Sequence, residues 1–197
     1  MEHNPYATPE ATLASPEDEA LVNAPFYVVS VRKAVILTLV TFSLYLVYWF
    51  YRNWSRYRAV SGEKVIPVLR GIFSVFFTHT LLRNVDTVIR DKGISYPWNY
   101  STVASVYVVI AVGGNLMSRM QPTWLDAAVI DLLSLLTVPL LAWVLAVMQR
   151  PVNVACGDET GASNASLTAA NWFWIVLGTL FWVTSLFGYY LMLTGQV

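Results

Sequence analysis

The residues of this chain that could do chemistry are few and scattered. Asp131 is a carboxylate inside a long apolar stretch, and an ionisable group within a membrane is a functional hypothesis by default. The alternative is that Asp131 lies close to the start of its helix, where it is hydrated or paired with Arg119. His79 and Cys156 stand without the neighbouring histidines or cysteines that a zinc site needs. We therefore predict no catalytic residue, no metal site and no cofactor.

A second candidate set combines arginines with aromatic side chains. Aromatic rings concentrate at membrane interfaces, and the arginines beside them meet lipid phosphates. The ordinary interpretation is an interfacial belt, and the sharper alternative is a specific site for an anionic headgroup. The predicted headgroup contacts are Trp49, Arg52, Arg56, Arg58, Arg83 and Arg90.

The aromatic-rich stretch that contains Trp49 resembles a known family. Its sequence TFSLYLVYWFY, residues 41–51, is similar to the signature T-x-G-x-Y-x-x-Y-W-x-Y of bacterial membrane proteins grouped as domain of unknown function 4234. The matching residues are Thr41, Tyr45, Tyr48, Trp49 and Tyr51, and Ser43 stands where the signature has glycine. The resemblance covers residues 27–60. It implies an integral protein of a bacterial inner membrane, with no established activity.

The composition places these residues in a membrane protein. Of the 197 residues, 56% are hydrophobic and 12% are charged, whereas a soluble domain carries about twice that charged fraction. The apolar residues form long uncharged blocks, which must be helices because lipid offers no partner to a backbone polar group. The formal net charge of zero argues against nucleic acid as a partner, because phosphate contacts need a basic excess.

Four blocks are long enough to span a bilayer, and they divide the chain into a tail and a membrane domain. The tail, residues 1–31, holds five acidic residues and no lysine or arginine, and we expect it to be flexible. Residues 32–197 form the predicted all-α, polytopic membrane bundle. Its four predicted transmembrane helices are about 34–51, 98–118, 127–148 and 172–194.

Between the first two blocks, residues 66–90 predict an amphipathic helix. His79, Arg83, Asp86 and Arg90 recur at steps of four, three and four, so they share one face of a helix. The opposite face is apolar, which predicts a helix that lies in the membrane interface. Whether residues 71–82 instead form a fifth span stays open at this point.

The basic residues predict the orientation. Four spans place nine lysines and arginines on one side of the membrane and three on the other. Because the basic side faces the cytoplasm, both termini are then predicted to face outward. A fifth span removes this asymmetry, which favours four spans.

Two classes of function remain. The first is a non-enzymatic membrane scaffold or partner-binding protein, multi-pass in the cell inner membrane, whose cytoplasmic surface contacts anionic headgroups. Its protein partner, or a second copy of the chain, is left open. The alternative is a small transporter or channel subunit with Asp131 in its pathway. Polar residues from three or more spans that converge on one cavity would favour the alternative.

Overall fold

The computed structural model describes residues 24–120 and 127–194, and within these ranges it is helical and contains no strand. This confirms the predicted all-α class. The helices are α2 (Val31–Val40), α3 (Leu44–Ser61), α4 (Pro67–Ile72), α5 (Ser74–Asp91), α6 (Tyr100–Met120), α7 (Ala127–Cys156) and α8 (Ala169–Leu193), with a short 3-10 turn η1 (Ala162–Asn164) before the last one.

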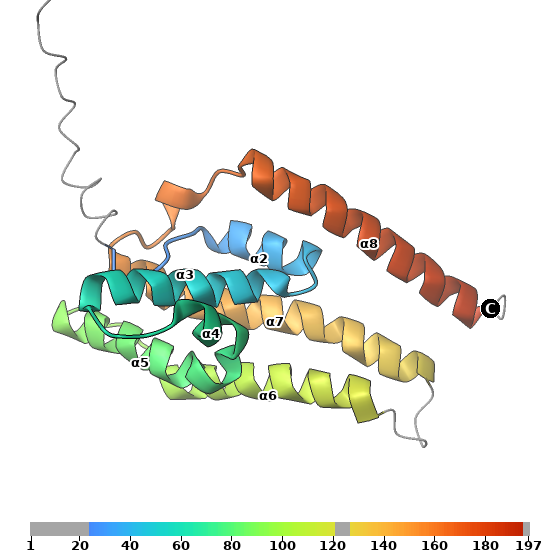
Figure 1. Cartoon of the computed structure of the whole chain (residues 1–197), viewed down its shortest axis with the longest axis horizontal. Coiled ribbons are helices and arrows are strands. Elements are labelled where there is room, and N and C mark those ends of the chain that lie inside the picture. Colours follow the sequence, from blue (N-terminus) through green and yellow to red (C-terminus); the bar gives the residue numbers. More distant parts are fainter. Residues whose placement is uncertain (1–23, 121–126, 195–197) are drawn as a thin grey trace, which may run out of the picture.

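Three of the described helices, α6, α7 and α8, are long and apolar enough to cross a membrane, which indicates a multi-pass membrane protein. They correspond to the predicted spans 98–118, 127–148 and 172–194. In Figure 1, α6 and α7 run side by side in opposite directions, and α8 leans across the other side of the molecule. The helix α7 passes through Pro139 and Pro151 and ends eight residues beyond the predicted boundary.

The fourth predicted span, residues 34–51, is not one helix. The chain breaks at residues 41–43, where Phe42 and Ser43 adopt φ values of 49° and 68°. The Ser43 N–H donates to the Thr38 carbonyl (2.8 Å) and closes α2, while the Thr41 hydroxyl accepts from the Tyr45 N–H (3.0 Å) and starts α3. The two helices therefore form an antiparallel hairpin (Figure 1). The prediction of a continuous first span is wrong.

The predicted interfacial helix is also divided. It consists of α4 and α5, which are separated at Phe73. Residues 71–82, the possible fifth span, are therefore not one continuous helix. In the second half of α5, Leu81, Leu82 and Val85 are fully buried, whereas Phe76 near its start is exposed, and α5 packs against α6 and α7. The apolar face of this helix thus contacts protein, whereas the sequence predicted that it would contact acyl chains.

The membrane domain begins earlier than predicted. Residues 1–23 of the predicted tail lie outside the described residues, but residues 24–29 are almost all buried in the core. Phe26 stacks on Tyr57 of α3, with ring centroids 5.9 Å apart. Residues 24–29 are therefore part of the helical domain, although the sequence assigned them to the tail.

Side-chain amides satisfy the backbone of this buried segment. The Tyr27 N–H donates to Asn53 Oδ1 (3.1 Å), and its carbonyl accepts from Gln149 Nε2 (3.2 Å). Asn153 bonds both the N–H and the carbonyl of Val29, at 3.4 and 3.0 Å. An extended segment that packs among helices has no neighbouring strand to bond with. Its buried backbone N–H and C=O groups therefore need side-chain partners. The amides of α3 and α7 thus fix the segment that leads into α2.

Candidate functional site

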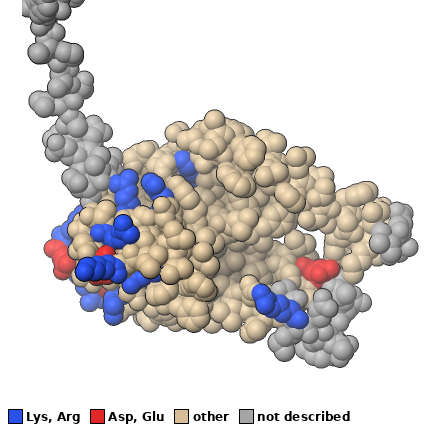
Figure 2. Space-filling view, in the orientation of Figure 1, with Lys and Arg blue, Asp and Glu red and all other residues tan. Residues whose placement is uncertain are grey.

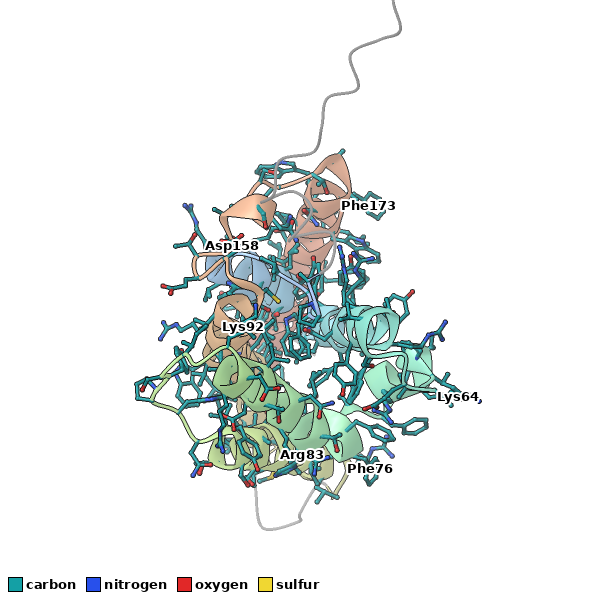
Figure 3. All side chains as sticks on the ribbon, turned by 90° about the vertical axis from the view of Figure 1, so that its left-hand side faces the viewer. Lys64, Phe76, Arg83, Lys92, Asp158 and Phe173 are labelled. Atoms are coloured by element: carbon teal, nitrogen blue, oxygen red, sulfur yellow. The ribbon has the colours of Figure 1, made fainter. Side chains whose placement is uncertain are left out.

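Basic side chains gather at one end of the molecule. Figure 2 shows them over the left-hand end, where α3 and α5 finish and α6 begins, and Figure 3 shows Lys64, Arg83 and Lys92 around that end. Arg119, in the last turn of α6, is the basic residue of the described ranges that lies at the opposite end. We call this the basic end, and its residues are Arg32, Lys33, Arg52, Arg56, Arg58, Lys64, Arg70, Arg83, Arg90, Lys92 and Arg150.

The structure brings five of the six predicted headgroup contacts to this end. Arg58, Arg83 and Arg90 are exposed, and Arg90 pairs with Asp86 one turn earlier on α5 (2.6 Å). Arg52 and Arg56 are half-buried. The basic end can therefore present several guanidinium groups to one surface.

Trp49 does not belong to this surface. Its side chain is 0% exposed, and its indole N–H donates to Gln149 Oε1 of α7. A buried indole needs such an acceptor, and Trp49 has found it inside the protein. The prediction that Trp49 contacts a headgroup is therefore corrected: this residue joins α3 to α7 in the core.

A groove lies between the hairpin and the last helix. It has a volume of about 520 Å³, and its walls are α2, α3, the loop before α8 and the first turns of α8. We call it the α2–α3–α8 groove. Side chains four residues apart on each helix line it: Lys33 and Leu37 on α2, Leu44, Tyr48 and Arg52 on α3, and Ala170 and Trp174 on α8. The wall is completed by Thr41 after α2 and by Tyr27, Tyr45, Asn164, Thr168 and Asn171.

Lys33 is the buried cation of the groove. The residue is 5% exposed, and its ammonium donates to Asn164 Oδ1 and to the Ser166 carbonyl, both at 2.7 Å. These two neutral acceptors occupy two of the three N–H groups of a lysine. Sequence reasoning treated Lys33 only as a flank of the first span, because nothing local indicates that the loop before α8 returns to it.

Arg52 is the second cation of the groove. Its guanidinium lies over the rings of Tyr27 and Tyr48, with centroid distances of 5.3 and 5.9 Å. Its Nε is buried and has no hydrogen-bond partner among the described residues. Among the residues that the structure describes, none of the side chains that line the groove is acidic. Two positive charges therefore face one cavity without a counter-ion from its wall.

A capped loop holds the outer wall of the groove. Asp158 accepts hydrogen bonds from the Ala162 and Ser163 N–H groups, both at 2.9 Å, and so fixes η1. Burial by itself would raise the pKa of Asp158, but these backbone hydrogen bonds outweigh it and lower the pKa below the ordinary value. Asn164, at the end of η1, donates to the Val28 carbonyl (2.9 Å) and ties the loop to the extended segment.

Asp131 lines a different cavity, of about 430 Å³, between α7, α8 and Phe42 of the hairpin turn. The polar side chains around it are Ser134 on the same helix and Ser185 and Tyr189 on α8. Within the described ranges Asp131 forms no ion pair with Arg119. The polar groups thus come from two spans, whereas the transporter alternative called for three or more.

His79 and Cys156, the other two candidate residues, each lie beside a polar group of the protein. The Nε2 of His79 lies 3.2 Å from the Ser105 hydroxyl of α6. Cys156 is a buried free thiol at the end of α7, and its Sγ lies 3.7 Å from the Phe26 carbonyl. No group of three or more potential metal ligands occurs among the described residues.

Comparison with known proteins finds no matching family, curated protein or solved structure, so the resemblance to domain of unknown function 4234 stays a prediction.

Proposed function

We propose that this chain is a non-enzymatic, multi-pass protein of a bacterial inner membrane that binds anionic lipid headgroups and acts as a membrane scaffold. The observation that carries the proposal is the basic end. Arginines and lysines from α2, α3, α4, α5 and α7 meet there, although they are far apart in the sequence. Each basic residue near an anionic surface contributes roughly 1 kcal/mol of attraction.

The hairpin supports a cytoplasmic position of this end. Because the chain reverses at residues 41–43, Arg32 and Lys33 lie at the same end as the arginines of α3. The sequence interpretation had placed them on opposite sides of the membrane. Only Arg119 is then left at the other end, which favours the basic end as the inner one. With three spans, the segment before α2 is cytoplasmic and the last turn of α8 faces outward.

The test is the lipid dependence of the full-length protein in nanodiscs. We expect a higher melting temperature in phosphatidylglycerol than in phosphatidylcholine. Arg58→Glu and Arg83→Glu, both at exposed positions of the basic end, should each reduce this difference in melting temperature, because each removes a basic residue that contributes roughly 1 kcal/mol of attraction. Arg58→Lys and Arg83→Lys keep the charge and are the matched controls, which should leave the difference unchanged. Equal stability of the wild type in both lipids would contradict the proposal.

A second candidate function is transport, with Asp131 as a proton- or cation-binding group. The observation in its favour is the cavity that Asp131 shares with Ser134, Ser185 and Tyr189. Asp131→Asn keeps the shape and removes the charge. A folded Asp131→Asn protein that loses an ion- or pH-dependent flux in proteoliposomes, while Asp131→Glu keeps part of it, would favour transport over the scaffold.

A further inference from the structure

We propose that the α2–α3–α8 groove is a site for a single anionic phospholipid, whose phosphate lies between Lys33 and Arg52 and whose acyl chains leave past Leu44 and Trp174. This inference rests on the proposed function, because it names one built site within a surface that otherwise attracts lipid diffusely. Three properties of the groove lead to it: its uncompensated charge, its polarity along the helices and its closed far end.

The charge requires an anion. Lys33 is buried against two neutral acceptors, and the Arg52 guanidinium lies over two tyrosine rings with its Nε unbonded. A buried cation is costly unless it is paired, and an unbonded buried donor adds to that cost. A phosphate offers several acceptor oxygens, which suit the planar donor set of arginine. In the groove it would accept from the Lys33 ammonium and from the Arg52 guanidinium, because both residues line the cavity.

The polarity of the groove matches an amphiphile. Along α2 the lining changes from Lys33 to Leu37, and along α3 it changes from Arg52 to Leu44, so the charged end and the apolar end coincide on both helices. The antiparallel hairpin produces this match. A soluble anion would use only the charged end, whereas a phospholipid uses both.

The groove is open at the side and closed at its far end. Leu44 is 67% exposed and Trp174 is 47% exposed, which leaves a lateral exit toward the membrane. At the far end, Gly178 of α8 lies so close to Val40 that a Cβ atom there would overlap the Val40 carbonyl. A lipid can therefore enter from the bilayer, and its chains must leave sideways.

The experiment is native mass spectrometry of the full-length protein released from nanodiscs that contain equal phosphatidylglycerol and phosphatidylcholine. We expect one retained phosphatidylglycerol per protein. Arg52→Ala should lower its retention about tenfold or more, because a charge-assisted hydrogen bond is lost. The matched control is Arg58→Gln, on the same helix but outside the groove, which should retain the lipid. Arg52→Lys keeps the positive charge, and its thermal stability shows whether a substitution at this position disturbs the fold.

A second variant separates the built site from diffuse attraction. Ala170→Trp fills the groove from the exposed start of α8 and leaves both cations in place. We expect this variant to lose the retained lipid while it keeps its higher stability in anionic nanodiscs. If Ala170→Trp retains the lipid and Arg58→Gln loses as much as Arg52→Ala, the site is refuted and the proposed function stands.

Two further results would overturn the inference. If the wild type retains no phosphatidylglycerol and shows no preference for anionic nanodiscs, both the site and the proposed function fail. If glycerol 3-phosphate displaces the lipid at equal concentration, the apolar half of the groove contributes nothing and the site binds a soluble anion. We expect glycerol 3-phosphate to compete at least a hundredfold less well, because it cannot occupy the apolar half of the groove.

Discussion

Asn153 shows how one polar side chain can decide the position of a whole segment. Its amide bonds the Val29 N–H and carbonyl and accepts from Gln149 Nε2 (2.6 Å), all without exposure to solvent. Asn153→Ala would leave two buried backbone groups unbonded, at about 1–3 kcal/mol each. We therefore expect a loss of about 2–6 kcal/mol in the free energy of unfolding.

Denaturant titration in detergent micelles measures this loss. The control is Asn84→Ala on α5, a half-exposed position, which should change stability by about 0.5 kcal/mol or less. An Asn153→Ala protein as stable as the wild type would show that the segment before α2 is not held by these amides.

Ser43 has a backbone conformation that is unfavourable for a serine. Its φ of 68° suits glycine, and its buried hydroxyl has no hydrogen-bond partner among the described residues. The left-handed region costs a residue other than glycine roughly 1–2 kcal/mol. Glycine avoids this cost, but part of the gain is lost because glycine makes the unfolded chain more flexible. We expect Ser43→Gly to stabilise the protein by about 0.5–1 kcal/mol.

The same titration, run on a pair of glycine variants, checks this expectation. Ser55→Gly, in the middle of α3, should destabilise the protein by about 0.5 kcal/mol, because glycine has a lower helix propensity than serine. If both variants destabilise equally, the left-handed turn between α2 and α3 is not the conformation of the protein.

Residue types alone predicted part of the site. Arg52 was predicted, because an arginine beside aromatic residues at the end of an apolar stretch suggests a headgroup contact. Lys33 was missed, because its partners Asn164 and Ser166 lie more than 130 positions away. Trp49 was misplaced for a related reason: its neighbours in sequence are interfacial, but its hydrogen-bond partner comes from α7. Local patterns cannot show such contacts.

At the scale of the elements, α8 depends on one close contact. Gly178 is its single buried residue among those described, and it packs against the Val40 backbone of α2. Trp182, one turn later, donates to the Leu39 carbonyl (2.8 Å) and stacks on Phe42 (4.4 Å). We expect Gly178→Val to separate α8 from α2, with a loss of about 1–3 kcal/mol from the clash alone.

Thermal unfolding in detergent measures this change. The matched control is Gly188→Val on the same helix, where a Cβ would meet nothing within 4 Å, and we expect it to unfold like the wild type. Equal behaviour of the two variants would show that α8 is not docked on the hairpin.

The elements themselves were predictable to different degrees. The three long apolar helices were predicted to within a few residues at most ends, because uncharged length is a sufficient signal for a span. The break at residues 41–43 was not predicted, since the stretch contains neither glycine nor proline. The amphipathic pattern of α5 was recognised, but periodicity does not distinguish a lipid partner from the protein partners α6 and α7.

At the scale of the whole molecule, the hairpin changes the topology. A continuous span over residues 34–51 would separate Arg32 from Ser61 by the full membrane. The hairpin puts both at the basic end, and α6, α7 and α8 are left as the candidate spans among the described residues. In the proposed topology the two ends of the described chain then face opposite sides of the membrane. The orientation, the lipid-binding surface and the groove all depend on this reversal.

Cysteine labelling tests the reversal directly. In a Cys156→Ala background, single cysteines at Arg32, Ser61 and Thr194 occupy exposed positions. An impermeant maleimide should label positions 32 and 61 only in inverted vesicles, and position 194 only in intact spheroplasts. Labelling of position 32 from outside, with position 61 labelled from inside, would contradict the hairpin and restore a continuous first span.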